Sequence, residues 1–294
     1  MSDLSIAPAA HCVAPRSRVR HLVRGLAGWP PSAWLSAGFL FLLALALAFP
    51  GWFTPHDPLL GDVAHAMQPP GAGHWFGTDR IGRDVLARVV YGARYSLVIG
   101  LASMLVSLLV GLVIGLTAGL GPRALDEGAS RIFDVLSAFP PILLSLFVVS
   151  FAGQGIVNIA VAVGIAGIPK FGRVLRARTL GVRRADYVRH APSYGYSRTR
   201  VFLRHLLPNV LIAIPVVATI DIGSAILAVS GLSFLGLGPQ PPTPEWGVML
   251  AEGRDVLRVA WWPSVFPGLA ITLTVVAFTV LGKTLSRQRQ GSSR

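Results

Sequence analysis

Long apolar runs separated by short polar connections are the main pattern along this chain. A bilayer core about 30 Å thick needs about 20 apolar residues in a helix. Runs of that order cover residues 33–53, 95–120, 209–237 and 261–282. The first run follows a long polar tail, 1–32, and we expect it to be an uncleaved anchor rather than a cleaved signal segment.

The stretch 135–168 carries no charged residue, and at about 1.5 Å per residue it is too long for one crossing. Its natural break is “AGQGIVN”, residues 152–158, because two glycines and two amides favour a turn. The pattern predicts a tight hairpin between helices at 133–152 and 156–176. The chain is therefore expected to make six α-helical crossings, with both termini on one side of the membrane.

The basic residues identify that side. Twenty of the 26 Lys and Arg residues fall in the N-terminal tail, the connection after the second crossing, the stretch 170–208 and the chain beyond residue 282. The opposite loops, 54–94 and 238–260, mix acids and bases evenly. Lys and Arg concentrate in the cytoplasmic loops of membrane proteins. Both termini, including the tail 285–294, and the loop 177–208 are thus expected to be cytoplasmic, and the loop 54–94 extracytoplasmic.

Composition agrees with an all-α multi-pass protein of the cell membrane. The 294 residues are 53% hydrophobic and 13% charged, with a mean hydropathy of +0.62, whereas soluble domains are about 25% charged. The net charge of +13 would suit nucleic acid, anionic lipid or an acidic protein surface. Because the basic residues follow membrane topology and enclose no aromatic stacking face, the lipid bilayer is expected as a partner and nucleic acid is not.

The sequence contains no catalytic constellation. “LGKT”, residues 281–284, lacks the earlier glycine of a phosphate-binding loop, since Ala277 stands there, and it follows a membrane helix rather than a strand. His56, His65 and His74 lie nine residues apart in one loop. A metal site would need a fold that brings them together, and we expect scattered loop histidines. The chain is predicted to be no enzyme, with no catalytic residue and no metal or cofactor of its own.

Asp221 is the one acid deep inside a predicted crossing. Placing a lone carboxylate there costs about 3 kcal/mol on insertion scales. It belongs either to a polar patch in a translocation path or to a hydrogen-bonded contact with a neighbouring helix. Gly223 and Ser224 beside it make close helix packing plausible, and both interpretations stay open.

Three stretches together resemble one family. They are “HWFGTDRIGRDVLARVVYGARYSLVIG” (74–100), “LSFLGLGPQPPTPEWGVML” (232–250) and the basic stretch “ADYVRHAPSYGYSRTRVFLRHLLPN” (185–209). The first two resemble signatures of the second permease subunit of dipeptide, oligopeptide and nickel ABC importers, and the third resembles the cytoplasmic loop of these permeases. The resemblance covers nearly the whole of 34–284.

This resemblance implies an inner-membrane permease with the type I ABC importer fold. It also implies several partners: a second homologous permease, two ATPase subunits that use ATP and Mg²⁺, and an extracytoplasmic solute-binding protein. Peptides are the expected solutes, and nickel or metal chelates, glutathione-like and opine-like solutes are the alternatives.

The first signature predicts a turn followed by a helix start, with an acid near the positive helix end. Its residues are Gly77, Thr78, Asp79, Gly82, Arg83 and Asp84. We favour a structural cap over a binding role, because the acids and bases of the loop can pair. In the second signature, “PQPPTPEW” would hold a loop open for a partner or simply end a helix. Trp246, Trp261 and Trp262 suit an interfacial aromatic belt.

The basic stretch is similar to a coupling helix that docks on an ATPase. Gly195 and the pair Leu207-Pro208 keep the spacing of that motif, and a helix, a turn at Gly195 and a second helix from Ser197 are predicted. The motif's Glu-Ala-Ala falls on Arg189-His190-Ala191, and Pro192 follows where a helix should continue. The residues assigned to ATPase coupling are Asp186, Tyr187, Arg189, His190, Ala191, Gly195, Leu207 and Pro208.

Two other classes of protein fit the sequence less well than an importer does. An ion-coupled secondary transporter would need more intramembrane charges and an inverted repeat. An intramembrane enzyme would need a catalytic pair inside its crossings. The sequence has one intramembrane acid, no repeat and no such pair, which favours the importer.

Overall fold

The computed structural model of the protein describes residues 29–291, and their side chains up to residue 288. Within that range the chain is helical, and β structure is confined to two isolated bridges, Gly61 with Arg83 and Thr78 with Asp84. Most of the predicted N-terminal tail and the end of the C-terminal tail lie outside the described residues. The helices are α2 (Pro31–Ala48), α3 (Val85–Leu120), α4 (Arg123–Ala138), α5 (Pro141–Ala152), α6 (Ile156–Arg184), α7 (Asp186–Arg189), α8 (Arg198–Val201), α9 (Leu207–Leu211), α10 (Ile214–Phe234), α11 (Trp246–Arg254) and α12 (Trp262–Gly291).

Five of the described helices, α2, α3, α6, α10 and α12, are long and apolar enough to cross a membrane. The pair α4 and α5 passes the same test together, which gives six crossings if a bent pair counts as one. The predicted all-helical, multi-span architecture is confirmed, and the number of crossings is five or six.

The helix predicted for 133–152 is not continuous in the structure. Its residues are divided between α4 and α5, which meet at an angle of 91° and form either a broken crossing or a re-entrant loop. Pro140 and Pro141 cause the break, because a residue before proline is driven out of the helical region. Phe139 accordingly has an extended backbone, with φ −97° and ψ 142°. After the bend, α5 ends at Ala152 and α6 begins at Ile156. The predicted glycine-rich turn connects the two helices.

Two further helix ends differ from the sequence boundaries. The helix of the first run ends at Ala48, and Pro50 opens a short 3₁₀ turn in its place. The second helix begins at Val85 rather than at residue 95, because Asp84 caps it with a side-chain bond to the Ala87 N–H. Residues 85–94, which belong to the predicted loop 54–94, are therefore the first turns of α3, and the helix start predicted from the first signature is confirmed.

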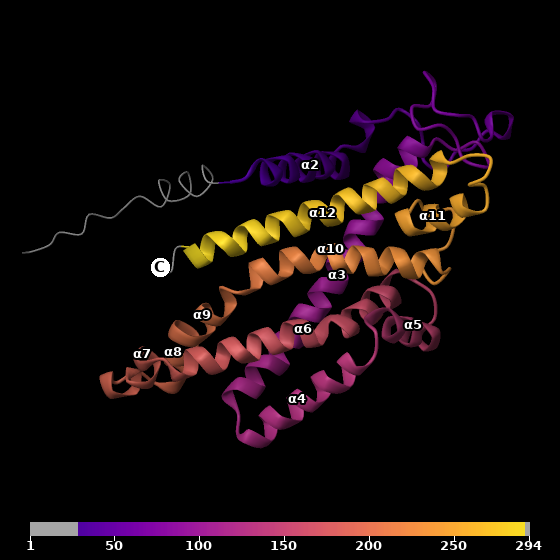
Figure 1. Cartoon of the computed structure of the whole chain (residues 1–294). Coiled ribbons are helices and arrows are strands. Elements are labelled where there is room, and N and C mark those ends of the chain that lie inside the picture. The colour runs from indigo at the N-terminus through magenta and orange to yellow at the C-terminus, as the bar shows by residue number, and fades with distance from the viewer. Residues whose placement is uncertain (1–28, 292–294) are drawn as a thin grey trace, which may run out of the picture.

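The helices form one elongated bundle. Figure 1 shows α2, α12 and α10 side by side, with α3 crossing behind them to reach α6 and α4. The loop before α3 lies with α11 at one end of the bundle. The segment α7–α9, the start of α2 and the end of α12 lie at the other end. The pairing of α3 with α6 is the most extensive helix contact.

Glycines allow that pairing. Gly111, Gly115 and Gly119 are four residues apart and so share one face of α3. A Cβ on Gly111 would lie 2.9 Å from the backbone nitrogen of Gly172, and one on Gly115 would lie 2.8 Å from its carbonyl oxygen. Small residues let membrane helices approach closely in this way. Gly172 is itself close to α4, because a Cβ on Gly172 would overlap the ring of Phe133.

Replacing Gly172 by Ala should therefore lower the stability of the chain by about 1–3 kcal/mol, because the added methyl group overpacks the contact with Phe133. Gly181→Ala on the same helix is the matched control, since nothing lies within 4 Å of a Cβ there. Thermal unfolding of the purified chain in detergent measures both variants. Equal effects at the two positions would contradict the close packing at Gly172.

Candidate functional site

The first signature is a tightly bonded turn at the beginning of α3. Gly77 and Gly82 have positive φ angles of 72° and 80°, which glycine adopts readily. The buried hydroxyl of Thr78 donates to the carbonyl of His65 at 2.6 Å, and its backbone oxygen accepts from the indole N–H of Trp262 at 2.8 Å. The turn is thus fixed to the loop before it and to the start of α12.

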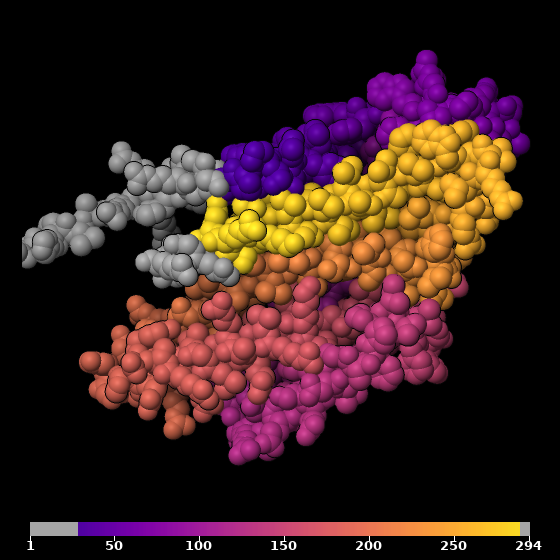
Figure 2. Space-filling model, in the orientation of Figure 1, coloured from indigo at the N-terminus to yellow at the C-terminus, as the bar shows by residue number. Residues whose placement is uncertain are grey.

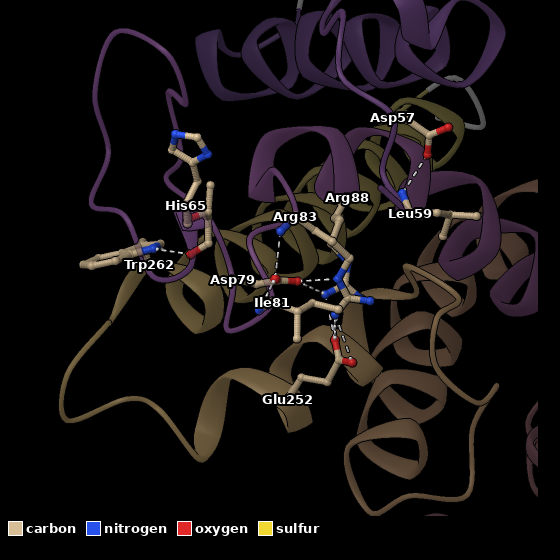
Figure 3. Close-up of polar contacts among 10 residues, drawn as sticks. Asp57, Leu59, His65, Asp79, Ile81, Arg83, Arg88, Glu252 and Trp262 are labelled. Atoms are coloured by element: carbon tan, nitrogen blue, oxygen red, sulfur yellow. Dashed lines mark hydrogen bonds and ion pairs between the residues drawn. The ribbon is translucent and has the colours of Figure 1, made fainter. Parts of the chain in front are cut away.

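Next to this turn lies a buried cluster of two acids and two arginines (Figure 3). Asp79 Oδ2 accepts from Arg83 Nε at 2.6 Å and from Arg88 Nη1 at 2.8 Å. Glu252 of α11 lies 3.2 Å from Arg83 Nη2 and 2.7 Å from Arg88 Nη1. Arg83 and Arg88 are 3% and 2% exposed. The acids and bases of the loop pair with one another, which agrees with a structural cap.

Asp84 holds the start of α3 and one histidine. Its Oδ1 accepts from the Ala87 N–H at 2.7 Å, and its Oδ2 lies 2.7 Å from His74 Nδ1. The rings of His56 and His74 lie 5.0 Å apart. Among the described residues, His56, His74 and Asp84 are the group of His, Cys, Asp and Glu side chains placed closely enough for a metal ion.

The third loop histidine lies elsewhere. His65 bonds the exposed carboxylate of Asp62 at 2.7 Å, and this hydrogen bond lowers the pKa of Asp62. The expectation of scattered loop histidines is therefore correct for His65 and wrong for His56 and His74, which the fold brings together.

The second signature packs directly on α3. Glu245 caps α11 by accepting from the Val248 N–H at 3.0 Å, and it also accepts from the Ser96 hydroxyl at 3.0 Å. Burial raises the pKa of Glu245, while its bonds to backbone N–H groups oppose that rise. The indole N–H of Trp246 donates to the Val89 carbonyl at 2.9 Å. The two signatures, far apart in sequence, thus form one bonded unit.

The tryptophans of this region differ from the predicted aromatic belt. Trp246 and Trp262 are 1% and 7% exposed, and both indole N–H groups donate to backbone carbonyls. Trp261 is half exposed, as a belt residue would be. The sequence does not separate these cases, because a buried tryptophan with a bonded N–H has the same local pattern.

A second polar site lies inside the bundle. Lys170 Nζ of α6 donates to Asp221 Oδ1 of α10 at 2.7 Å. The two residues line a cavity of about 240 Å³ that α3, α5, α6 and α10 enclose, together with Ser107, Ser145 and Ser224. Figure 2 shows a hollow between α10 and the α5–α6 pair, with part of α3 at its floor.

Asp221 therefore makes the helix contact that one of the two sequence interpretations requires, while its place in a translocation path stays a prediction. Its side chain is hydrogen-bonded to a neighbouring helix and is 9% exposed, and it also borders the cavity. The Lys170 side chain is 41% exposed. The sequence does not predict this pair, because Lys170 begins the basic stretch 170–208 that is assigned to the cytoplasmic side.

The basic stretch protrudes at the opposite end of the bundle from the signatures (Figure 1). Gly195 has a φ of 81° and separates α7 with its following turn from α8. The Ser197 hydroxyl caps α8 by accepting from the Arg200 N–H at 3.3 Å. Helical backbone then continues through a π-turn, Phe202–Leu206, into α9. Pro208, which has no N–H to donate, follows that irregular turn.

Pro192 causes no helix defect here. It occupies the first turn of a separate 3₁₀ helix, Ala191–Tyr194, where a missing N–H is tolerated. Ala191 is buried with Val188 and Val201 in a small apolar core of the segment. The residues that depart from the family motif, Arg189, His190 and Pro192, therefore lie at the end of α7 and in the turn after it. This part of the chain has its own small apolar core.

The remaining predicted coupling residues face outward or support the segment. Asp186, Tyr187, Arg189, His190, Gly195 and Pro208 are exposed, and Leu207 is half-buried. Tyr194, which lies between these residues in the same turn, is 80% exposed. An open hollow of about 400 Å³ lies where α6 meets α7, and it is lined by Arg183, Arg184 and Arg189. The segment thus presents basic and aromatic side chains on a compact projection.

Residues 111–289, more than half of the chain, match the family described as the binding-protein-dependent transport system inner membrane component. The chain belongs to this family. It is therefore an inner-membrane permease component of the ABC importer type.

The relatives of this permease are named for transport. The glutathione transport system permease protein GsiD of Salmonella paratyphi A is 44% identical over 254 residues, which cover 86% of this chain and 84% of that protein. GsiD of Escherichia coli is 43% identical over 254 residues, with the same coverage. These relatives are permeases and not enzymes.

A solved structure shares the fold. A chain from the crystal structure of an amino acid ABC transporter with histidines superposes with a TM-score of 0.53 at 15% identity. The superposition covers 68% of this permease and 94% of that chain. At this level of identity the similarity shows the fold alone.

Sequence reasoning missed two members of the permease's charged cluster, Arg88 and Glu252. Arg88 offered a signal, because an arginine among the apolar residues that follow Asp84 needs a buried acid. The sequence does not indicate which acid this is, since Glu252 is 169 residues from Arg83.

Glu252→Ala should lower the stability of the permease by about 3 kcal/mol, because it leaves Arg83 and Arg88 short of one buried counter-charge. Asp255→Ala is the control, since the Asp255–Arg254 pair is 59% and 60% exposed and should contribute less than about 1 kcal/mol. Thermal unfolding in detergent compares them. A loss at Glu252 no larger than that at Asp255 would count against the cluster.

Proposed function

We propose that this permease forms the translocation path of an ATP-driven importer for a peptide-type solute such as glutathione. The observation that carries the proposal is 44% identity along 86% of the chain to a glutathione transport permease. An extracytoplasmic binding protein would deliver the solute. A second homologous permease would complete the path, and two ATPase subunits would hydrolyse ATP with Mg²⁺.

The orientation follows from charge. The end of the bundle with α7–α9 carries the projecting basic segment, and the described ends of the chain lie there too. We place this end in the cytoplasm by the positive-inside rule. The signatures, with α11, then face the extracytoplasmic binding protein.

Transport would proceed by alternating access. Closure of the ATPase dimer draws the α7–α9 segments together, which shuts the cytoplasmic gate and opens the outer one. The segment suits this task because it has its own small core and continues through α9 toward α10. No bond of the solute changes, so transport itself needs no catalytic group on this chain.

The Lys170–Asp221 pair supports a charged, zwitterionic solute. A peptide carries a carboxylate that can bind Lys170 and an ammonium group that can bind Asp221. A charged side chain within a membrane protein needs a partner. Lys170 and Asp221 can therefore pair with each other when no solute is bound, and with the charges of the solute when it is present. Nickel, metal-chelate and opine-like solutes are the alternative cargoes. Membership of the permease family disfavours an ion-coupled secondary transporter.

The first functional prediction concerns the turn of the coupling segment. Gly195→Pro should reduce solute uptake by the assembled transporter at least tenfold, because proline cannot adopt a φ of 81°. Gly195→Asn is the matched control: asparagine tolerates positive φ, and nothing lies within 4 Å of a Cβ at this position.

Uptake and ATP turnover are measured in vesicles that contain the whole transporter, together with the amount of permease inserted. We expect normal insertion for both variants and continued uptake only for Gly195→Asn. Normal uptake by Gly195→Pro would overturn the coupling role.

The second functional prediction separates a solute-binding role of the ion pair from a structural one. Lys170→Ala should abolish uptake and lower stability by about 1–3 kcal/mol, because it leaves Asp221 without its partner while the exposed position of Lys170 weakens the pair. The exchange Lys170→Asp with Asp221→Lys restores a pair with reversed polarity. It should recover stability and assembly but not glutathione uptake, and recovery of uptake would show that the pair serves structure alone.

A further inference from the structure

The loop between α2 and α3 gathers three potential metal ligands. One donor atom from each of His56, His74 and Asp84 lies within 4.8 Å of the others. His56 and Asp84 also line a cavity of about 170 Å³ beside Trp75 and Thr54. The cavity leaves room for an ion with one or two water ligands next to the protein donors.

The donor set selects a class of ion. Two imidazoles and one carboxylate suit first-row divalent ions such as Zn²⁺, with bonds of about 2.0–2.2 Å. Tetrahedral bonds of that length place neighbouring donors about 3.3 Å apart. His74 Nδ1 and Asp84 Oδ2 are now 2.7 Å apart, so metal binding at these atoms would replace their hydrogen bond and part them by about 0.6 Å.

The electrostatics favour a cation at this point. Asp84 is 3% exposed, and its Oδ1 is occupied by the cap of α3. The arginines Arg83 and Arg88 pair with Asp79 and Glu252, whereas the ion-pair partner of Asp84 is His74. A divalent ion would supply the buried carboxylate with a stronger counter-charge.

We propose that His56, His74 and Asp84 form a binding site for a divalent transition-metal ion, for which Zn²⁺ is the probe. The bound ion would tie the segment that follows α2 to the first turn of α3. This site lies in the loop between α2 and α3 and at the start of α3, apart from the Lys170–Asp221 cavity. It would bind a resident ion rather than the transported solute.

Zn²⁺ titration of the purified full chain, stripped with a chelator and competed with a chromophoric zinc indicator, tests the site. His11, Cys12 and His21 in the N-terminal tail are replaced by Ala in every sample, because they could also bind zinc. We expect one tight equivalent of Zn²⁺ and at least tenfold weaker binding for His56→Ala. The His56 side chain is exposed, so this variant should fold normally.

His65→Ala is the matched control, since His65 is a histidine of the same loop that bonds Asp62 outside the group. It should bind Zn²⁺ as tightly as the parent chain. Zn²⁺ should also raise the unfolding temperature of the parent and of His65→Ala, and leave that of His56→Ala unchanged. Absence of a tight equivalent in the parent, or equal affinity in His56→Ala, would overturn the proposal. Neither measurement requires transport, so failure here leaves the proposed function untouched.

Discussion

A guanidinium group buried in the first turns of α3 constrains one whole end of the molecule. Arg88 is 2% exposed, and a buried charge without partners is strongly destabilising. Asp79 supplies one partner from the loop before α3, and Glu252 supplies the other from α11. Loop, helix start and α11 must therefore be in place together. The bond from Trp262 to Thr78 brings α12 into the same arrangement.

The permease has two groups of charged side chains in its interior, and they differ in their exposure to solvent and in the number of their bonds. In the cluster around Arg88, two acids face two arginines, and the most exposed of the four side chains, Glu252, is 17% exposed. In the Lys170–Asp221 pair, a single bond joins two helices and the lysine remains 41% exposed beside a cavity. The first group is suited to fixing a structure. The second leaves its lysine accessible from the cavity.

Much of this architecture could be predicted because membranes impose simple rules. Apolar runs located the crossings, two glycines located the hairpin after Ala152, and Gly195 and Ser197 located the turn within the α7–α9 segment. The rest depended on contacts between distant residues. Neither the partner of Asp221 nor the approach of His56 to His74 has any local signal. The bend between α4 and α5 did have one in Pro140-Pro141, which the lack of charge in 135–168 concealed.

The length of α3 links the two ends of the permease mechanically. Its 36 residues extend about 54 Å, well beyond a hydrocarbon core of about 30 Å. Its first turns are held by the charged cluster, and the carbonyls of its last turn accept from Arg183, just before α7. The glycines of its C-terminal third rest on the backbone of α6. One continuous helix therefore joins α11 at one end of the bundle to α6 at the other, so a displacement of α3 at either end has to be accommodated by both neighbours.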